Sequence, residues 1–195
     1  MNDKVTVNVT GVIRAPVTDV WSIAREFTTA WHPAMASCEL KGGADPFAPG
    51  ALRRFTVHGE SQRYAERLTG FSDDQRYLAY TLEEGPAALE AYNAAFELTP
   101  APWQDWTRVC WSGVFSCARD QASRFWVGTD QAYRSGIDEL ARRFGVPRAP
   151  EPDALDHVRL DGVPRIAVTS AGRGDLCLFL HGIGGSRVVW QDQLA

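Results

Sequence analysis

The sequence predicts an α+β fold in which a curved antiparallel sheet wraps around one long C-terminal helix. Three observations predict it. A strand-like segment opens the chain, six further strand-like segments with turn residues between them follow, and residues 119–145 carry the strongest helical pattern. Strands and helices that are segregated along a chain in this way are typical of the α+β class.

The first strand and the helix after it are marked by a change of period. Residues 5–16 alternate valines with polar residues, which predicts a strand with one buried face, and Pro16 ends it because proline has no N–H for the ladder. Apolar residues then recur at helical spacing through residues 17–27, so we expect a short amphipathic helix there. A second short helix or turn should follow, broken near Pro33.

Six strands are expected between residues 37 and 117. They are SCELKGG, the two arms of a hairpin that turns at His58, QRYLAYTLEEG, EAYNAAFELTP and DWTRVCWSGVFSC. Alternate residues of the last strand share one apolar face, which we expect to look inward: Val109, Trp111, Gly113 and Phe115.

The helix over residues 119–145 has a strongly apolar face. Its apolar residues advance by three or four positions, and Asp120 and Gly145 suit its two ends. Four aromatic rings lie on that face. A helix so long and aromatic needs a wide concave partner, which a curved antiparallel sheet supplies.

Two further segments follow this helix. Residues 146–156 contain three prolines and little to bury, which predicts an extended interdomain linker. Residues 157–195 predict a hairpin, a turn and an apolar strand that runs into HGIGGSRVVW. The predicted domains are therefore 1–145 and 157–195, joined by the linker.

The order of one strand, two short helices, six strands and a long helix is the helix-grip arrangement, and residues 1–145 resemble the SRPBCC superfamily. This superfamily includes START-like proteins and polyketide cyclases. The matching motifs are IRAPVTDVW, WHP, PGALRRF, ERL and YRSGIDELARRFG. The resemblance implies a large apolar cavity between sheet and helix that holds small hydrophobic molecules. Some members bind or carry these molecules, and others are cyclases, aromatases or dehydratases.

Residues 157–195 resemble the N-terminal beginning of an α/β-hydrolase domain, through the strand and the HGIGGSRVVW turn. The match assigns Gly182 and Ile183 to an oxyanion-hole turn. The nucleophile elbow G-x-S-x-G is absent, and Ser186 has no base or acid in sight, so residues 1–195 should not perform triad chemistry. We therefore expect a truncated product or the first part of a longer fusion.

The candidate site residues lie on strand faces or helix positions with aromatic neighbours. An Arg53–Glu66 pair on adjacent strands would either hold a polar ligand group or satisfy itself. His32 and Glu66 are candidates for acid–base work, with a structural role as the alternative for His32. Simple core packing is the competing interpretation for the aromatic residues. The candidate ligand-binding residues are Trp31, Arg53, Glu66, Tyr80, Tyr92, Trp111, Phe115, Trp126 and Tyr133.

Composition and charge argue against several partner classes. A net charge of −4 and a pI of about 5.6 do not favour nucleic acid or an anionic membrane surface. The four cysteines form no C-x-x-C pair and no histidine lies at ligand spacing, so we expect reduced thiols, no metal and no cofactor. No signal pattern or membrane-spanning run is present, which predicts a cytoplasmic protein. A homodimer stays open.

Three functions follow from these patterns. The favoured one is binding of a small hydrophobic molecule in the cavity, without chemical change. The alternatives are a cyclase- or dehydratase-type enzyme in which His32, Glu66 or a tyrosine moves protons, and an ester- or carbon–carbon-bond-cleaving hydrolase that requires further chain. A binder should show apolar walls with one or two polar anchors, whereas an enzyme should show a buried ionisable group with a perturbed pKa.

Overall fold

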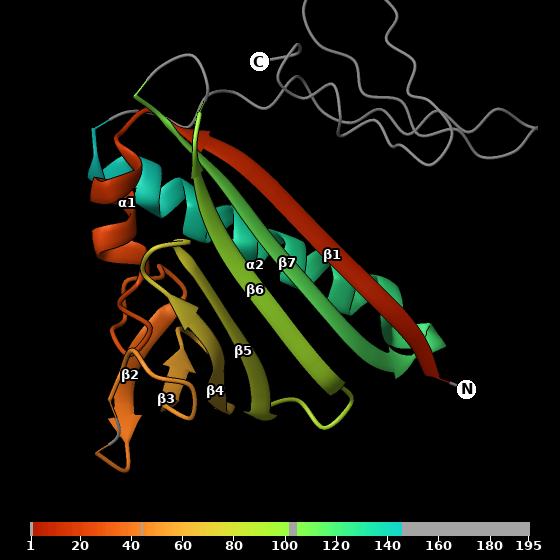
Figure 1. The fold of residues 1–195 in the computed structure, drawn as a ribbon. Coiled ribbons are helices and arrows are strands. Elements are labelled where there is room, and N and C mark those ends of the chain that lie inside the picture. The colour runs from red at the N-terminus through yellow and green to blue at the C-terminus, as the bar shows by residue number, and fades with distance from the viewer. Residues whose placement is uncertain (1, 44, 102–104, 146–195) are drawn as a thin grey trace, which may run out of the picture. The chain divides into compact units, whose positions relative to one another are not determined.

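One sheet of seven antiparallel strands and two α-helices make up the part of the chain that the computed structural model describes, residues 2–43, 45–101 and 105–145 (Figure 1). The segment around Pro33 forms turns and bends, which is the second of the two alternatives, short helix or turn, predicted there. In chain order the elements are β1 (Asn2–Ile13), α1 (Val17–Ala24), β2 (Met35–Lys41), β3 (Leu52–Val57), β4 (Arg63–Ser72), β5 (Tyr77–Glu84), β6 (Glu90–Pro100), β7 (Thr107–Ala118), the 3₁₀ turn η1 (Arg119–Gln121) and α2 (Ala122–Arg143).

The strands are arranged in the order β1-β7-β6-β5-β4-β3-β2, so the first and last strands of the chain are neighbours. Val5 pairs with Phe115 and Val7 with Gly113 in the β1–β7 ladder. These four residues are buried, as the alternating pattern of both strands predicts. The inward face of β7 is therefore confirmed.

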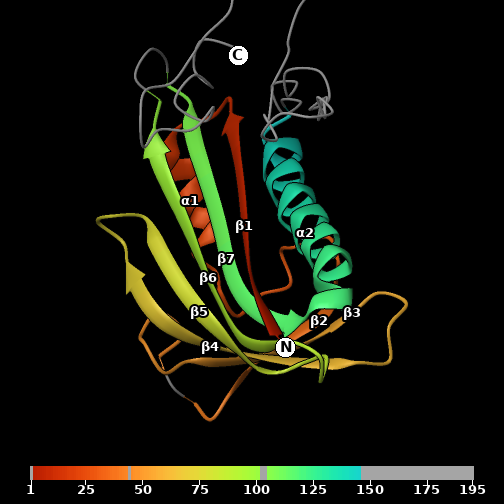
Figure 2. The same cartoon turned by 90° about the vertical axis from the view of Figure 1, so that its right-hand side faces the viewer.

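The sheet curves because several of its ladders are interrupted. Register shifts occur between Ala65 and Glu66, and again between Glu90 and Asn93, where Ala91 has a φ of 51°. Such bulges bend a strand and increase its local twist. Figure 2 shows the result, in which β1, β7 and β6 run beside α2 while β5 to β2 turn across. The α+β helix-grip fold is thereby confirmed for the described residues.

Helix α2 packs one face against β1 and β7. Gly136 lies at the closest approach, because a Cβ atom there would be 2.6 Å from the Trp111 ring and 2.8 Å from the His32 ring. Ile137 and Leu140 are wholly buried, and burial of each such side chain stabilises the fold by about 1.5–3 kcal/mol. The buried residues of α2 are Tyr133, Gly136, Ile137, Leu140 and Ala141.

The described residues also bear on the predicted absences. None of the helices in this part of the chain is long and apolar enough to cross a membrane. Within the same residues, no group of three His, Cys, Asp or Glu side chains gathers as a metal site would require. Cys38, Cys110 and Cys117 are unpaired thiols, while the fourth cysteine lies outside the described residues.

Candidate ligand-binding cavity

A cavity of about 1460 Å³ lies between the concave face of the sheet and α2. Its volume is larger than the roughly 300–1,000 Å³ of typical small-molecule pockets. Exposed residues from the β3–β4 loop, the β5–β6 loop and the first turns of α2 line its mouth, among them Gln62, Ala87 and Val127. Eight predicted site residues line the cavity: Trp31, His32, Arg53, Glu66, Tyr80, Tyr92, Trp111 and Tyr133.

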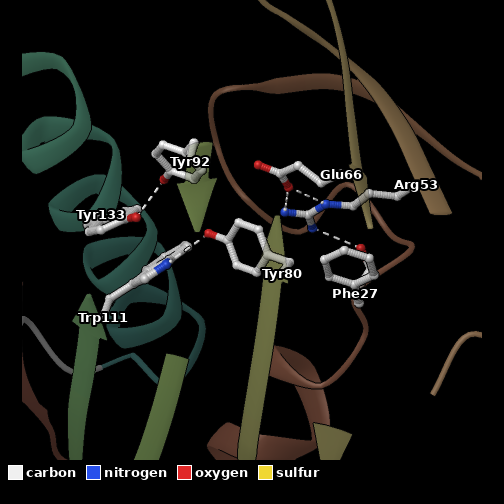
Figure 3. Close-up of polar contacts among 7 residues, drawn as sticks. All are labelled: Phe27, Arg53, Glu66, Tyr80, Tyr92, Trp111 and Tyr133. Atoms are coloured by element: carbon white, nitrogen blue, oxygen red, sulfur yellow. Dashed lines mark hydrogen bonds and ion pairs between the residues drawn. The ribbon is translucent and has the colours of Figure 1, made fainter. Parts of the chain in front are cut away.

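A buried ion pair between β3 and β4 is the main charged feature of the cavity. Arg53 and Glu66 are directly opposite in the ladder, and their side chains are 7% and 8% exposed. Arg53 donates to Glu66 Oε2 from Nε at 2.8 Å and from Nη2 at 2.5 Å, and its Nη1 donates to the Phe27 carbonyl at 2.8 Å (Figure 3). The guanidinium also lies 4.1 Å from the centre of the Phe27 ring.

The ion pair leaves one carboxylate oxygen unused. Both bonds from Arg53 end on Oε2 of Glu66, and no other described residue hydrogen-bonds Oε1. Figure 3 shows this second oxygen pointing away from the guanidinium. Burial raises the pKa of Glu66, and Arg53 counteracts that rise. Burial alone would lower the pKa of Arg53, but Glu66 reverses that effect, so the guanidinium stays charged.

A second polar cluster, called the hydroxyl cluster below, is formed by Tyr80, Tyr92, Tyr133 and Trp111. The Tyr80 ring lies between the ion pair and the other three members (Figure 3). Trp111 Nε1 donates to the Tyr80 hydroxyl at 3.0 Å, and the hydroxyls of Tyr92 and Tyr133 lie 2.5 Å apart. The Tyr133 ring stacks on Trp111 with ring centres 4.6 Å apart. Burial raises the pKa of all three tyrosines, so they remain neutral hydroxyls at physiological pH.

His32 is held by both ring nitrogens. The backbone N–H of Ala34 donates to Nδ1 at 3.1 Å, which leaves Nε2 to carry the proton and donate to the Ala132 carbonyl at 2.9 Å. The ring is 7% exposed, and burial lowers its pKa. Since its one lone pair is already used, His32 ties the loop before β2 to α2, and its geometry favours the structural role over acid–base work.

The His32 contacts predict a pH-dependent stability. A pKa below the ordinary value of 6.5 in the folded state means that protons bind more strongly to the unfolded chain. His32 should therefore contribute its full stability above pH 6.5, and that contribution should fall as the pH is lowered towards 5, by up to about 1.4 kcal/mol per pH unit. Urea unfolding between pH 7 and 5 should show a shallower decline for His32→Gln than for the wild type. Parallel curves for the two proteins would contradict this assignment.

Two candidate residues are not among the residues that line the cavity. Phe115 is wholly buried and packs under the cavity wall, with its ring stacked on Tyr92 at 5.9 Å. Trp126 is 42% exposed and does not line the cavity. Successive helix positions are separated by about 100°, so Phe125 faces the cavity while the next residue turns towards solvent.

Several lining residues were missed by the sequence interpretation. Phe55 and Val57 follow Arg53 at alternate positions of β3, a period-2 pattern that identifies them in retrospect. Phe27 follows α1 at helical spacing from Ala24. The β5–β6 loop lines the cavity with Pro86, Ala87, Ala88 and Leu89, but its sequence carries no periodic signal.

The expectations for the C-terminal segment fall on residues that the structure does not describe. The linker 146–156, the hydrolase-like segment 157–195 and its turn residues Gly182 and Ile183 all lie outside the described residues.

Solved structures from several bacteria resemble this chain. A protein from Nitrosospira multiformis is 29% identical with a TM-score of 0.60, and the match covers 73% of this chain and 96% of that one. A protein from Thermobifida fusca is 28% identical with a TM-score of 0.63, covering 72% and 93% respectively. The Bacillus cereus protein XoxI is 20% identical over 71% and 94%, with a TM-score of 0.63, and this likeness concerns the fold alone.

A comparison with curated proteins found no match. A comparison with family models found a match over a similar part of the chain. The family model described as "Polyketide cyclase / dehydrase and lipid transport" matches residues 4–145, which is the region that forms the sheet, α2 and the cavity. The match stops before residue 157 and gives no support to a hydrolase-type segment. On this evidence the chain belongs to the polyketide cyclase/dehydrase and lipid transport family.

Proposed function

We propose that residues 4–145 bind one small, mainly apolar molecule in the cavity between the sheet and α2. The cavity is the main support for this proposal, because it combines a volume of about 1460 Å³ with predominantly apolar and aromatic walls. Burial of apolar ligand surface against such walls supplies the driving force. The family, whose description includes lipid transport as well as cyclase and dehydrase activity, supports the same class of ligand.

Glu66 is the proposed polar anchor for this molecule. Arg53 donates no hydrogen bond to its Oε1, and the side chain lines the cavity. A hydrogen bond to a charged group is worth about 1.5–3 kcal/mol. A ligand hydroxyl or amine can donate such a bond to Oε1, so the site favours an apolar molecule with at least one hydrogen-bond donor.

The binding proposal predicts that the full chain binds N-phenyl-1-naphthylamine, a neutral apolar fluorophore that emits weakly in water. We expect a Kd of about 10 μM or below, with energy transfer from Trp31 and Trp111, which line the cavity. Thr129→Trp places a large ring on the cavity-lining face of α2 and should raise the Kd roughly tenfold or more. Fluorescence titration measures both values.

The matched control for this titration is Asp138→Trp, which adds the same ring to an exposed position of α2 outside the cavity. It should leave the affinity unchanged. Absence of binding to the wild type, or equal weakening by both tryptophan substitutions, would remove the support for a ligand cavity.

The raised pKa of Glu66 favours a second candidate function. A buried carboxyl that faces a substrate cavity is suited to proton transfer, which would make the domain a cyclase- or dehydratase-type enzyme. Uptake of deuterium at the α carbon of 1-tetralone in D₂O separates the two functions. An enzyme accelerates the uptake and loses this effect in Glu66→Gln, whereas a binder accelerates it in neither protein.

A further inference from the structure

In the hydroxyl cluster of Tyr80, Tyr92, Tyr133 and Trp111, the Trp111 indole determines which group donates the first hydrogen bond. An indole N–H can only donate a hydrogen bond, and here it donates to the Tyr80 oxygen. The Tyr80 hydroxyl must therefore direct its own hydrogen elsewhere. Among the described residues, the other hydrogen bond within this cluster joins the hydroxyls of Tyr92 and Tyr133.

The cluster has more polar hydrogens than hydrogen bonds between its members. Trp111, Tyr80, Tyr92 and Tyr133 bring four polar hydrogens. Among the described residues two hydrogen bonds join them, one from Trp111 to Tyr80 and one between Tyr92 and Tyr133, in which either hydroxyl can donate. At least one tyrosine hydroxyl hydrogen of the cluster is consequently left without an acceptor among the described residues.

The hydroxyls of this cluster belong to buried side chains. Tyr92 is 9% and Tyr133 is 3% exposed, and both line the cavity. Tyr133 is held by its stacking on Trp111, and its hydroxyl lies close to Gly113, where a Cβ atom would collide with it. A donor that is buried and held in place costs little to reorganise when an acceptor arrives.

We infer that the ligand places a carbonyl oxygen against the hydroxyl cluster of Tyr80, Tyr92 and Tyr133. This inference rests on the proposed binding function and adds the chemistry of a second polar group. The ligand class is a mainly apolar molecule that carries a carbonyl as acceptor and a hydroxyl or amine as donor. The carbonyl meets the hydroxyl cluster, and the donor meets Oε1 of Glu66.

Two probes of the same shape test the inference on the full chain. In 1-acetylnaphthalene the carbonyl oxygen can accept a hydrogen bond, while in 1-isopropenylnaphthalene a methylene group replaces that oxygen. Displacement of N-phenyl-1-naphthylamine gives a Kd for each probe, and the ratio of the two values cancels their shared apolar contribution. The variant is Tyr80→Phe/Tyr92→Phe/Tyr133→Phe, which removes every hydroxyl of the cluster and retains its rings.

The wild type should favour the ketone, relative to the triple variant, by about five- to tenfold in this ratio. Tyr64→Phe is the matched control, because Tyr64 lines the cavity but its hydroxyl donates to Glu60 outside the cluster. It should keep the wild-type ratio. Where the triple variant does not fold, Tyr92→Phe/Tyr133→Phe serves in its place and should reduce the preference as well.

This experiment distinguishes failure of the carbonyl inference from failure of the proposed binding function. Binding of the fluorophore with the same probe ratio in the wild type and the hydroxyl variant overturns the carbonyl inference and leaves the binding function intact. Failure of the fluorophore to bind the wild type overturns the binding function, and the carbonyl inference falls with it.

Discussion

Glu66→Ala should lower the free energy of unfolding by about 3–5 kcal/mol, because it leaves the Arg53 guanidinium buried without its counter-charge. The Phe27 carbonyl and the Phe27 ring remain as partners of Arg53, but neither carries a charge. Denaturant unfolding of the wild type and the variant at neutral pH measures this difference.

Two controls separate charge burial from the loss of a contact. Glu83→Ala removes the partner of Arg67 in an ion pair whose side chains are each 38% exposed, and it should cost less than about 1 kcal/mol. Arg53→Met/Glu66→Leu removes both buried charges, so it should be much less destabilising than Glu66→Ala alone. A small effect of Glu66→Ala, equal to that of Glu83→Ala, would show that Arg53 is adequately solvated without Glu66.

Gly136→Ala should destabilise the fold by about 1–2 kcal/mol, although alanine is the better helix former. Its Cβ would meet the Trp111 and His32 rings, which are both buried and hydrogen-bonded, so neither can yield easily. Overpacking of this kind costs about 1–3 kcal/mol, and the gain in helix propensity offsets up to about 1 kcal/mol of it. Thermal and denaturant unfolding both report the change.

Gly128→Ala is the matched variant in the same helix. No atom lies within 4 Å of a Cβ at Gly128, so only the propensity term applies and the variant should be more stable by up to about 1 kcal/mol. The opposite signs of the two substitutions are the expected result. Stabilisation by both would mean that α2 can move away from the sheet without cost.

The order of the elements could be predicted from the sequence, because in most elements the spacing of the apolar residues matches the face that is buried. The valines of β1 alternate and are buried, and the apolar positions of α2 recur at helical spacing and face the sheet. The segment near Pro33 was harder to assign, because its apolar residues follow neither period. There the backbone is organised by a contact from 100 residues away, the bond from His32 to Ala132.

The site was predictable where local geometry determines it. Arg53 and Glu66 stand at equal distances from the middle of the β3–β4 hairpin, so a correctly placed turn makes them neighbours. The hydroxyl cluster was not predictable in the same way. It depends on a side chain from α2 meeting side chains from β5, β6 and β7, and on the absence of a Cβ at Gly113. Contacts between side chains of separate elements cannot be predicted from the spacing of residues along the sequence.

The pairing of the first strand with the last has a consequence for synthesis. Asn2 lies opposite Ala118 and Ile13 opposite Thr107, so the ladder between β1 and β7 joins residues about a hundred positions apart. A ribosome releases β1 first, and the strand has no neighbour until β7 and then α2 have left the exit tunnel. Folds dominated by such distant pairings form slowly, so we expect the nascent domain to fold only after α2 has left the exit tunnel and to need shielding by chaperones until then.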